Sequence, residues 1–232
     1  MTALTVALVI PALNEERSLA LVLAELPRER LSEVVVADNG STDLTADVAR
    51  AGGATVVREG RRGYGAACLA GLAHLRANPP GVVVFLDADH SDDPADLESL
   101  LAPLMRGEAD LVIGSRVLGE REPGAFTPVQ AFGNALAAAL LQLCFGARVT
   151  DLGPFRAIRW DALELLAMRD RDYGWTVEMQ ARALRLGLRV TEVPVRYRRR
   201  RLGRSKVAGT VSGALGAGWK ILFTIARVRL GG

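Results

Sequence analysis

Short apolar runs that alternate with stretches long enough for a helix are the feature that most constrains this chain. The runs are rich in β-branched residues and occupy residues 4–10, 33–37, 54–59, 81–86 and 109–115. Strands of this kind that alternate with helices predict a mostly parallel sheet with helices on both faces. Buried parallel strands are apolar along their whole length, as these runs are. The sequence therefore predicts an α/β fold.

Polar clusters follow three of the predicted strands, at Pro11–Glu15, Asp38–Asp43 and Asp87–Asp93. In open parallel sheets, ligands bind in the crevice outside the carboxyl ends of the strands. The topology therefore predicts that these three clusters line one binding site. A Gly-rich stretch, Gly63–Gly71, lacks the full dinucleotide-binding pattern. Its glycines are expected to allow a close approach between backbone segments.

The densest cluster, DADHSDDP, begins where an apolar strand ends. Asp87 and Asp89 are two residues apart, so both side chains can reach the predicted crevice. Two carboxylates in one place require a cation, or one of them must take up a proton. Oxygen ligands without His or Cys favour Mg²⁺ or Mn²⁺, which carboxylates commonly hold together with substrate phosphates. The cluster predicts a metal that bridges to a phosphorylated ligand; the alternative is a solvated acidic turn before the helix at Pro94.

Cap residues indicate where several helices begin. Asn14 is expected to cap the helix after the first strand, and Ser41 or Thr42 the helix after the second. Asp43 is interpreted as an ordinary cap residue. A long apolar helix is predicted at residues 129–145, and its polar side chains make it a poor membrane span. These polar residues are Gln130, Asn134 and Gln142.

The C-terminal part of the chain is markedly basic. The run Arg196–Lys206 precedes a predicted apolar helix within residues 207–232, so the chain is divided into a main domain, residues 1–206, and this helix. Lys220, Arg227 and Arg229 lie on the helix. A basic loop before an apolar helix fits a segment at the membrane interface, attracted to anionic lipids. A helix packed on the protein core is the other interpretation.

Composition narrows the class of protein. The net charge of +3 is small, and the basic run has no interleaved aromatic residue besides Tyr197, so nucleic-acid binding is not expected. Two cysteines, Cys68 and Cys144, form no disulfide framework and fit a reducing compartment. Two histidines without a Cys cluster exclude an ordinary zinc site. A cytoplasmic location is expected, with peripheral binding at the inner membrane face if the C-terminal helix is interfacial.

Four motifs, PALNEE, VVVADNGSTD, FLDADHSDDP and VIGSR, occur in the order and spacing of family 2 glycosyltransferases. The chain resembles this family from Val6 to Lys206, and most closely the branch of dolichyl-phosphate mannose synthases and bacterial polyprenyl-phosphate sugar transferases. The resemblance implies a GT-A fold with a Rossmann-like, mostly parallel sheet. It also implies a GDP- or UDP-sugar donor, Mg²⁺ or Mn²⁺, inversion at the anomeric carbon, and a polyprenyl or dolichyl phosphate acceptor.

The resemblance also implies roles for single residues. Those expected at the nucleotide, the metal and its diphosphate are Pro11, Ala12, Leu13, Glu15, Val36, Asp38, Asp87, Ala88, Asp89, Ser91 and Arg200. Asp89 is expected to contact the metal directly, with Asp87 nearer the ribose or a metal-bound water. Arg116 and Lys206 are expected to act on phosphate groups during catalysis.

The catalytic base is left open. A hydroxyl acceptor needs a carboxylate that takes its proton, and Asp151 and Glu178 are the candidates. A lipid monophosphate acceptor is already ionised and needs no strong base, and Asp151 would then position Arg156 or Lys206. Two other functions are weighed: a soluble glycosyltransferase with a small hydroxylated acceptor, and a nucleotide-sugar-binding protein without turnover.

Overall fold

A seven-stranded sheet forms the centre of the computed structural model, which describes residues 4–200, 202 and 211–231. The strand order is β3-β2-β1-β4-β6-β5-β7. The strands are β1 (Val6–Ala12), β2 (Glu33–Asp38), β3 (Thr55–Arg58), β4 (Val82–Phe85), β5 (Leu111–Ser115), β6 (Arg156–Arg159) and β7 (Val190–Pro194). Only β6 runs antiparallel to its neighbours, β4 and β5. The predicted mostly parallel α/β sheet is confirmed.

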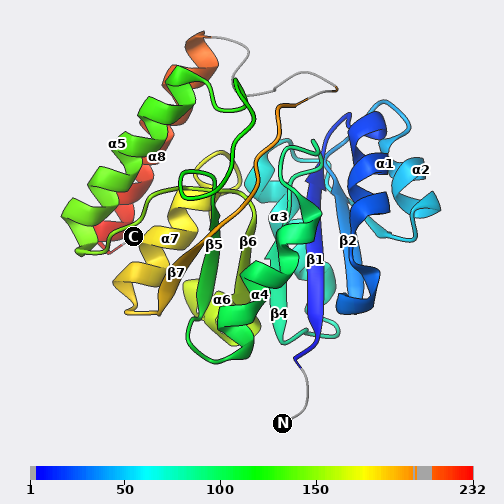
Figure 1. Ribbon diagram of the computed structural model, residues 1–232, viewed down its shortest axis with the longest axis horizontal. Coiled ribbons are helices and arrows are strands. Elements are labelled where there is room, and N and C mark those ends of the chain that lie inside the picture. The colour runs from blue at the N-terminus through cyan, green and yellow to red at the C-terminus, as the bar shows by residue number, and fades with distance from the viewer. Residues whose placement is uncertain (1–3, 201, 203–210, 232) are drawn as a thin grey trace.

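Helices cover both faces of the sheet (Figure 1). They are α1 (Glu16–Glu25), α2 (Thr45–Ala51), α3 (Tyr64–Leu75), α4 (Leu97–Met105), α5 (Pro128–Phe145), α6 (Trp160–Leu166), α7 (Trp175–Arg185) and α8 (Val211–Arg229), with short 3₁₀ turns η1 (Arg28–Arg30) and η2 (Pro94–Asp96). Apolar side chains of α1, α2 and α4 pack on one face, and those of α3, α6 and α7 on the other. A third cluster joins α5, α7 and α8 at one side of the molecule.

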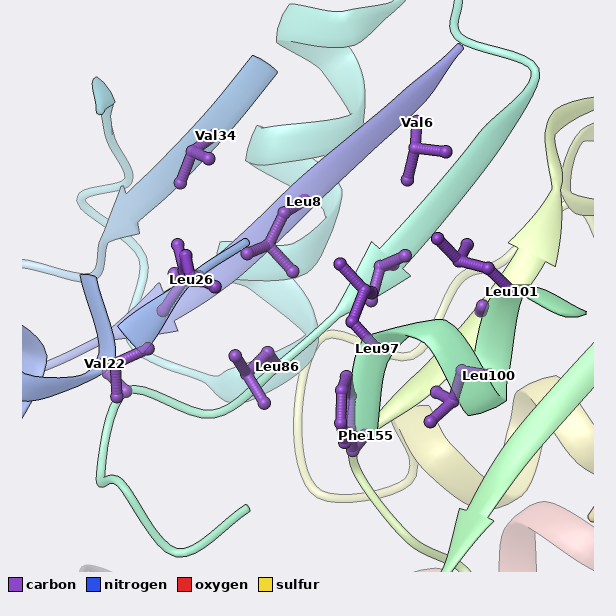
Figure 2. Packing of buried hydrophobic residues seen from close by; sticks show 14 of the residues in the cluster. Val6, Leu8, Val22, Leu26, Val34, Leu86, Leu97, Leu100, Leu101 and Phe155 are labelled. Atoms are coloured by element: carbon purple, nitrogen blue, oxygen red, sulfur yellow. The ribbon is translucent and has the colours of Figure 1, made fainter. Parts of the chain in front are cut away.

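The central strand β1 is buried on both faces, which is why its sequence is apolar throughout. Leu8 and Ile10 point into the cluster under α1 and α4, part of which Figure 2 shows, and Ala7 and Val9 point into the opposite cluster. Alternate side chains of a strand point to opposite faces, and both faces of this strand are buried. The strand therefore anchors the pocket that lies beyond its carboxyl end.

The predicted caps at Asn14 and at Ser41 or Thr42 are wrong, because these residues join two loops. Asn14 has a left-handed backbone with a φ of 51°. Its backbone N–H donates to Ser41 Oγ at 2.9 Å, and its Oδ1 accepts from the backbone N–H of Thr42 at 2.8 Å. The Asp43 carboxylate accepts from the backbone N–H of Thr45 at 3.0 Å, in the first turn of α2. Asp43 therefore has the cap-like role that the sequence predicted.

The C-terminal helix α8 packs on α5 and α7, with Ile225 and Val228 buried in the shared cluster. Two of its three basic residues pair with protein carboxylates: Lys220 Nζ lies 3.1 Å from an oxygen of Asp170, and Arg227 Nη2 lies 3.2 Å from one of Glu178. Part of the described outer surface of α8 is apolar. Its exposed residues include Trp219, Leu222 and Phe223.

Helix α5 alone, among the helices that the structure describes, is long and apolar enough to cross a membrane, a test that core helices also pass. Asn134 attaches it to the protein, because its side chain donates to the carbonyl of Thr150 and accepts from the backbone N–H of Leu152. Only 22% of the helix is buried. Its outward side chains, Val129, Phe132, Leu136 and Leu143, are exposed.

Candidate active site

A pocket of about 520 Å³ opens beyond the carboxyl ends of β1, β2, β4 and β5. Its lining residues are Pro11, Ala12, Leu13, Glu15, Asn39, Arg62, Gly63, Tyr64, Ala67, Asp87, Ala88, Asp89, Arg116, Gln130, Pro154, Asp172, Tyr173, Tyr197 and Arg200. The three polar clusters that follow the strands therefore do contribute to one site, as the sheet topology predicted.

Most of the predicted site residues lie together in this pocket. Those that line it are Pro11, Ala12, Leu13, Glu15, Asp87, Ala88, Asp89, Arg116 and Arg200. Those described outside its lining are Val36, Asp38, Ser91, Asp151 and Glu178. Lys206 lies outside the residues that the structure describes.

Three of the residues outside the lining lie in the core or in the turns that border the pocket. The side chain of Val36 is fully buried in the core and does not line the pocket, so its expected place at the nucleotide stays a prediction. Asp38 Oδ1 accepts from the backbone N–H of Ser41 at 3.0 Å and so closes the turn after β2, while its neighbour Asn39 reaches the pocket. The backbone N–H of Ser91 donates to Asp89 Oδ1 at 3.0 Å and orients that carboxylate.

Asp87 and Asp89 form the acidic centre of the pocket. Tyr64 Oη donates to Asp87 Oδ1 at 2.9 Å. Burial, and then the negative charge of Asp89, raise the pKa of Asp87 to about 7. A divalent cation would stabilise both carboxylates in their ionised form. No cluster of three His, Cys, Asp or Glu side chains that could hold a metal occurs among the described residues. A Mg²⁺ ion held by one or two carboxylates generally takes its other ligands from substrate phosphates and water.

The guanidinium of Arg200 lines the pocket beside Asp89. Its Nη2 donates to the Glu15 carboxylate and lies 3.8 Å from Asp89 Oδ2. Its side chain is 21% exposed, so most of its surface is removed from water. The guanidinium therefore lies where it can meet a diphosphate that is held by the carboxylate pair.

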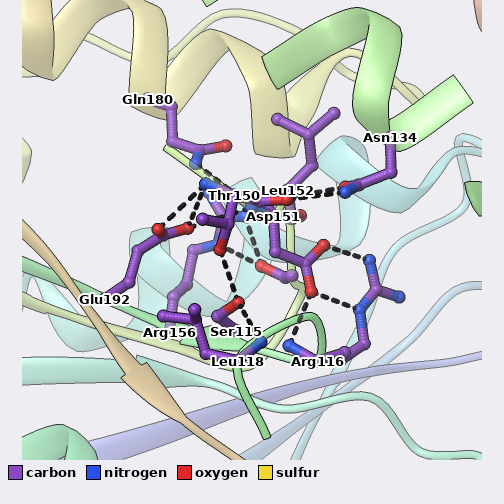
Figure 3. A network of polar contacts seen from close by, with 11 residues as sticks. Ser115, Arg116, Leu118, Asn134, Thr150, Asp151, Leu152, Arg156, Gln180 and Glu192 are labelled. Carbon is purple, nitrogen blue, oxygen red and sulfur yellow. Dashed lines mark hydrogen bonds and ion pairs between the residues drawn. The ribbon is translucent and has the colours of Figure 1, made fainter. Parts of the chain in front are cut away.

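Arg116 and Asp151 form a buried, bidentate ion pair (Figure 3). Asp151 Oδ2 accepts from the backbone N–H and Nε of Arg116 at 2.7 and 2.8 Å, and Oδ1 accepts from Nη2 at 2.7 Å. Burial opposes the charge of Arg116, but the pair with Asp151 outweighs it and raises the pKa of the guanidinium. Phe126 and Tyr197 stack on the guanidinium at 4.8 and 5.1 Å. Asp151 thus holds a permanent cation at the pocket wall.

The sequence predicts that Asp151 positions Arg156 or Lys206 for a phosphate acceptor. Arg156 instead binds backbone carbonyls, and Lys206 lies outside the residues that the structure describes. Its Nη1 donates to the carbonyl of Thr176 at 2.8 Å, and its Nη2 to that of Leu152 at 2.8 Å. Burial lowers the pKa of Arg156 to about 10. Arg156 therefore fixes the loop that brings Pro154 to the pocket.

Glu178, the second candidate base, lies in a different polar cluster. It is fully buried, and its Oε2 accepts from the backbone N–H groups of Arg169 and Asp170 at 3.1 and 2.7 Å. Its Oε1 accepts from Arg182 and Arg227. The carboxylate is therefore surrounded by protein donors and does not line the pocket.

Several pocket residues were missed by sequence reasoning: Tyr64, Gln130, Asp172, Tyr173 and Tyr197. A signal existed for Tyr64, because α3 begins just beyond the third strand. The others reach the pocket from segments distant in the chain, and no local pattern marks them. The close backbone approach expected of the Gly-rich stretch is confirmed at Gly65, where a Cβ atom would lie 2.1 Å from the carbonyl oxygen of Asp170.

A Rossmann-like sheet with an acidic pair and arginines at the carboxyl ends of its strands defines the GT-A class of glycosyltransferases. The chain belongs to family 2 of these enzymes, since the family model described as Glycosyl transferase family 2 matches residues 7–166. The alternative of a binding protein without turnover is therefore not favoured.

Related proteins support this assignment. The chain is 42% identical over 222 residues to an uncharacterized glycosyltransferase of Mycobacterium tuberculosis, covering 94% of this chain and 97% of that protein. It is 36% identical over 221 residues to an undecaprenyl-phosphate mannosyltransferase of Micrococcus luteus, covering 88% of each. A crystal structure of glucosyl-3-phosphoglycerate synthase from M. tuberculosis, in complex with Mn²⁺ and UDP-glucose, superposes with a TM-score of 0.76. That match is 26% identical and covers 97% of this chain and 79% of the other.

Proposed function

We propose that this enzyme transfers a sugar, with inversion, from a GDP- or UDP-sugar to a polyprenyl or dolichyl phosphate, using Mg²⁺ or Mn²⁺. The relative from M. luteus, named as an undecaprenyl-phosphate mannosyltransferase, supports the lipid-phosphate acceptor. The solved complex with Mn²⁺ and UDP-glucose supports the metal and the class of donor. Mannose is a candidate sugar only by that similarity.

The observation that best supports a lipid acceptor is the position of α5. Its third residue, Gln130, lines the pocket, while the nearby Val129 and Phe132 are 65% and 72% exposed. A polar headgroup in the pocket would therefore have an uncharged apolar surface next to it, on which an isoprenoid chain can lie. Helix α8, which packs beside α5, exposes further apolar side chains, Trp219 and Phe223.

The pocket residues suggest how transfer proceeds. Asp87 and Asp89 would hold the metal, which acts as a Lewis acid on the diphosphate. Arg200 would offset the negative charge that builds on the leaving diphosphate. Arg116, kept charged and fixed by Asp151, would bind the phosphate of the acceptor. An acceptor phosphate oxygen could then attack the anomeric carbon from the face opposite to the leaving group.

Ligand-dependent stability tests the donor and the metal. We expect either UDP or GDP to raise the melting temperature in the presence of Mn²⁺ and much less in EDTA, because a ligand that binds only the native state stabilises it. A thermal-shift panel of UDP, GDP, their sugars, ADP and CDP measures this. Equal shifts with and without metal would contradict a metal bridge to the diphosphate.

Vesicle binding tests the apolar surface. We expect Phe132→Ser together with Leu136→Ser to reduce co-sedimentation with vesicles at least about tenfold, because each exposed side chain contributes about 1.5–3 kcal/mol when buried in lipid. The control is Leu165→Ser, a 66% exposed apolar residue on α6. Vesicles with and without anionic lipid separate apolar from electrostatic attraction. Equal binding by all variants would contradict the interfacial role of α5.

A second candidate function is transfer to a hydroxylated acceptor, and Asp172 is the observation that favours it. This exposed carboxylate lines the pocket and could take a proton from a hydroxyl group. Purified enzyme assayed with polyprenyl phosphate in detergent and with soluble hydroxylated acceptors separates the two functions. If Asp172→Asn lost transfer to soluble acceptors but kept transfer to polyprenyl phosphate, the second function would be favoured.

A further inference from the structure

One face of α8 is polar and points toward the protein. Lys220, Thr224 and Arg227 are spaced so that they share one helix face. Lys220 Nζ lies 3.1 Å from Asp170 Oδ2, and Arg227 Nη2 lies 3.2 Å from Glu178 Oε1. The two carboxylate side chains are 1% and 0% exposed, so each needs a cationic or hydrogen-bonded partner.

Asp170 connects α8 with the pocket. While its Oδ2 faces Lys220, its Oδ1 accepts from the backbone N–H of Asp172 at 2.8 Å. Its own backbone N–H donates to Glu178 Oε2 at 2.7 Å. A Cβ atom on Gly174 would lie 2.5 Å from Asp170 Oδ2, so the carboxylate fits tightly beneath this glycine. The buried carboxylate of Asp170 therefore contacts Lys220 of α8 through one oxygen and the backbone of Asp172 through the other.

The segment 170–173, here called the pocket loop, lies against the start of α3. The backbone N–H of Ala66 donates to the carbonyl of Arg171 at 2.9 Å. Asp172 and Tyr173 of the pocket loop line the pocket, as does Tyr64 at the first position of α3. Tyr64 in turn donates to Asp87, one of the two predicted metal ligands. The pocket loop thus lies between α8 and the acidic centre.

We propose that Lys220 of the C-terminal helix is a positioning residue for this pocket. By neutralising Asp170, it holds the pocket loop against α3, so that Asp172 and Tyr173 face the ligand and Tyr64 keeps its bond to Asp87. α8 is then part of the catalytic unit and not an appended anchor. The role of the pocket loop in turnover rests on the proposed function, whereas its attachment through Lys220 does not.

Amide hydrogen exchange of the full-length protein, resolved by NMR, tests the attachment without any substrate. In Lys220→Met we expect the amides of Asp172 and Ala66 to exchange at least about tenfold faster, because local opening becomes easier. Core amides of β1 and β4 should keep their wild-type rates. Lys220→Arg should restore protection. The matched control is Arg229→Met, a basic residue on the same helix that is exposed; it should leave both amides unchanged.

Wild-type exchange of Asp172 and Ala66 in Lys220→Met would overturn the proposal. If that variant does not fold, Lys220→Gln, whose amide still reaches toward Asp170, replaces it. The exchange of the Asp172 and Ala66 amides should then also be faster than in the wild type, by a smaller factor. Steady-state kinetics provide the second test: Lys220→Met should lower kcat about tenfold and Lys220→Arg should restore it. Faster exchange with unchanged kcat and KM would overturn the catalytic part. A wild-type enzyme inactive with all donors would instead contradict the proposed function, and the exchange result would still decide the attachment.

Discussion

Asp89→Ala is expected to lower metal-dependent transfer at least about 100-fold, because we propose Asp89 as a metal ligand and its loss would remove several kcal/mol of transition-state stabilisation. The carboxylate lines the pocket, is oriented by the backbone N–H of Ser91, and has Arg200 3.8 Å away. Without it, the diphosphate loses its cation bridge while the arginine remains. Calorimetry should therefore show weaker nucleotide binding in Mn²⁺ and unchanged binding in EDTA.

The matched control for this variant is Asp47→Ala. Asp47 is a carboxylate on α2 with a 71% exposed side chain that pairs with Arg50 at the surface. Exposed pairs of this kind contribute little, so neither stability nor activity should change measurably. Asp89→Ala with full Mn²⁺-dependent transfer would exclude the acidic pair as the metal site.

Asp151→Asn is expected to reduce turnover roughly 10- to 100-fold without changing the shape of the pH–rate profile. The substitution keeps the size of the side chain but removes the charge that pairs with Arg116. Charge-assisted hydrogen bonds contribute about 1.5–3 kcal/mol each, which corresponds to that range in rate. A base would behave differently, because its replacement removes the acidic limb of the profile.

Geometry favours the positioning role of Asp151. The residue has no exposed surface, and Arg116 occupies both carboxylate oxygens at 2.7–2.8 Å. Asp151→Ala should in addition lower the free energy of unfolding by about 3–5 kcal/mol, since it leaves a buried guanidinium unpaired. Urea denaturation measures this loss. The exposed pair Asp161–Arg159 offers the control Asp161→Asn. An acid limb that disappears only in Asp151→Asn would restore Asp151 as the base.

The sequence by itself determined the α/β class, the strands and the part of the site that follows them. Apolar runs such as Val82–Phe85 can only be buried strands when helical segments alternate with them. In a parallel sheet the residues after such strands share one edge, so Pro11, Asn39 and Asp87 could be placed together without coordinates. Sequence also located the acidic pair, because its chemistry depends on two residues that are neighbours in the chain.

Only the tertiary structure decided the partners of buried charges. Asp151 pairs with Arg116 across 35 positions, and Lys220 pairs with Asp170 across a larger separation. Neither spacing is periodic, so no pattern indicates which cation meets which carboxylate. The fold chooses these pairs because a buried charge is stable only beside an opposite one. For the same reason Glu178, a plausible base in sequence, lies among Arg182 and Arg227 and not in the pocket.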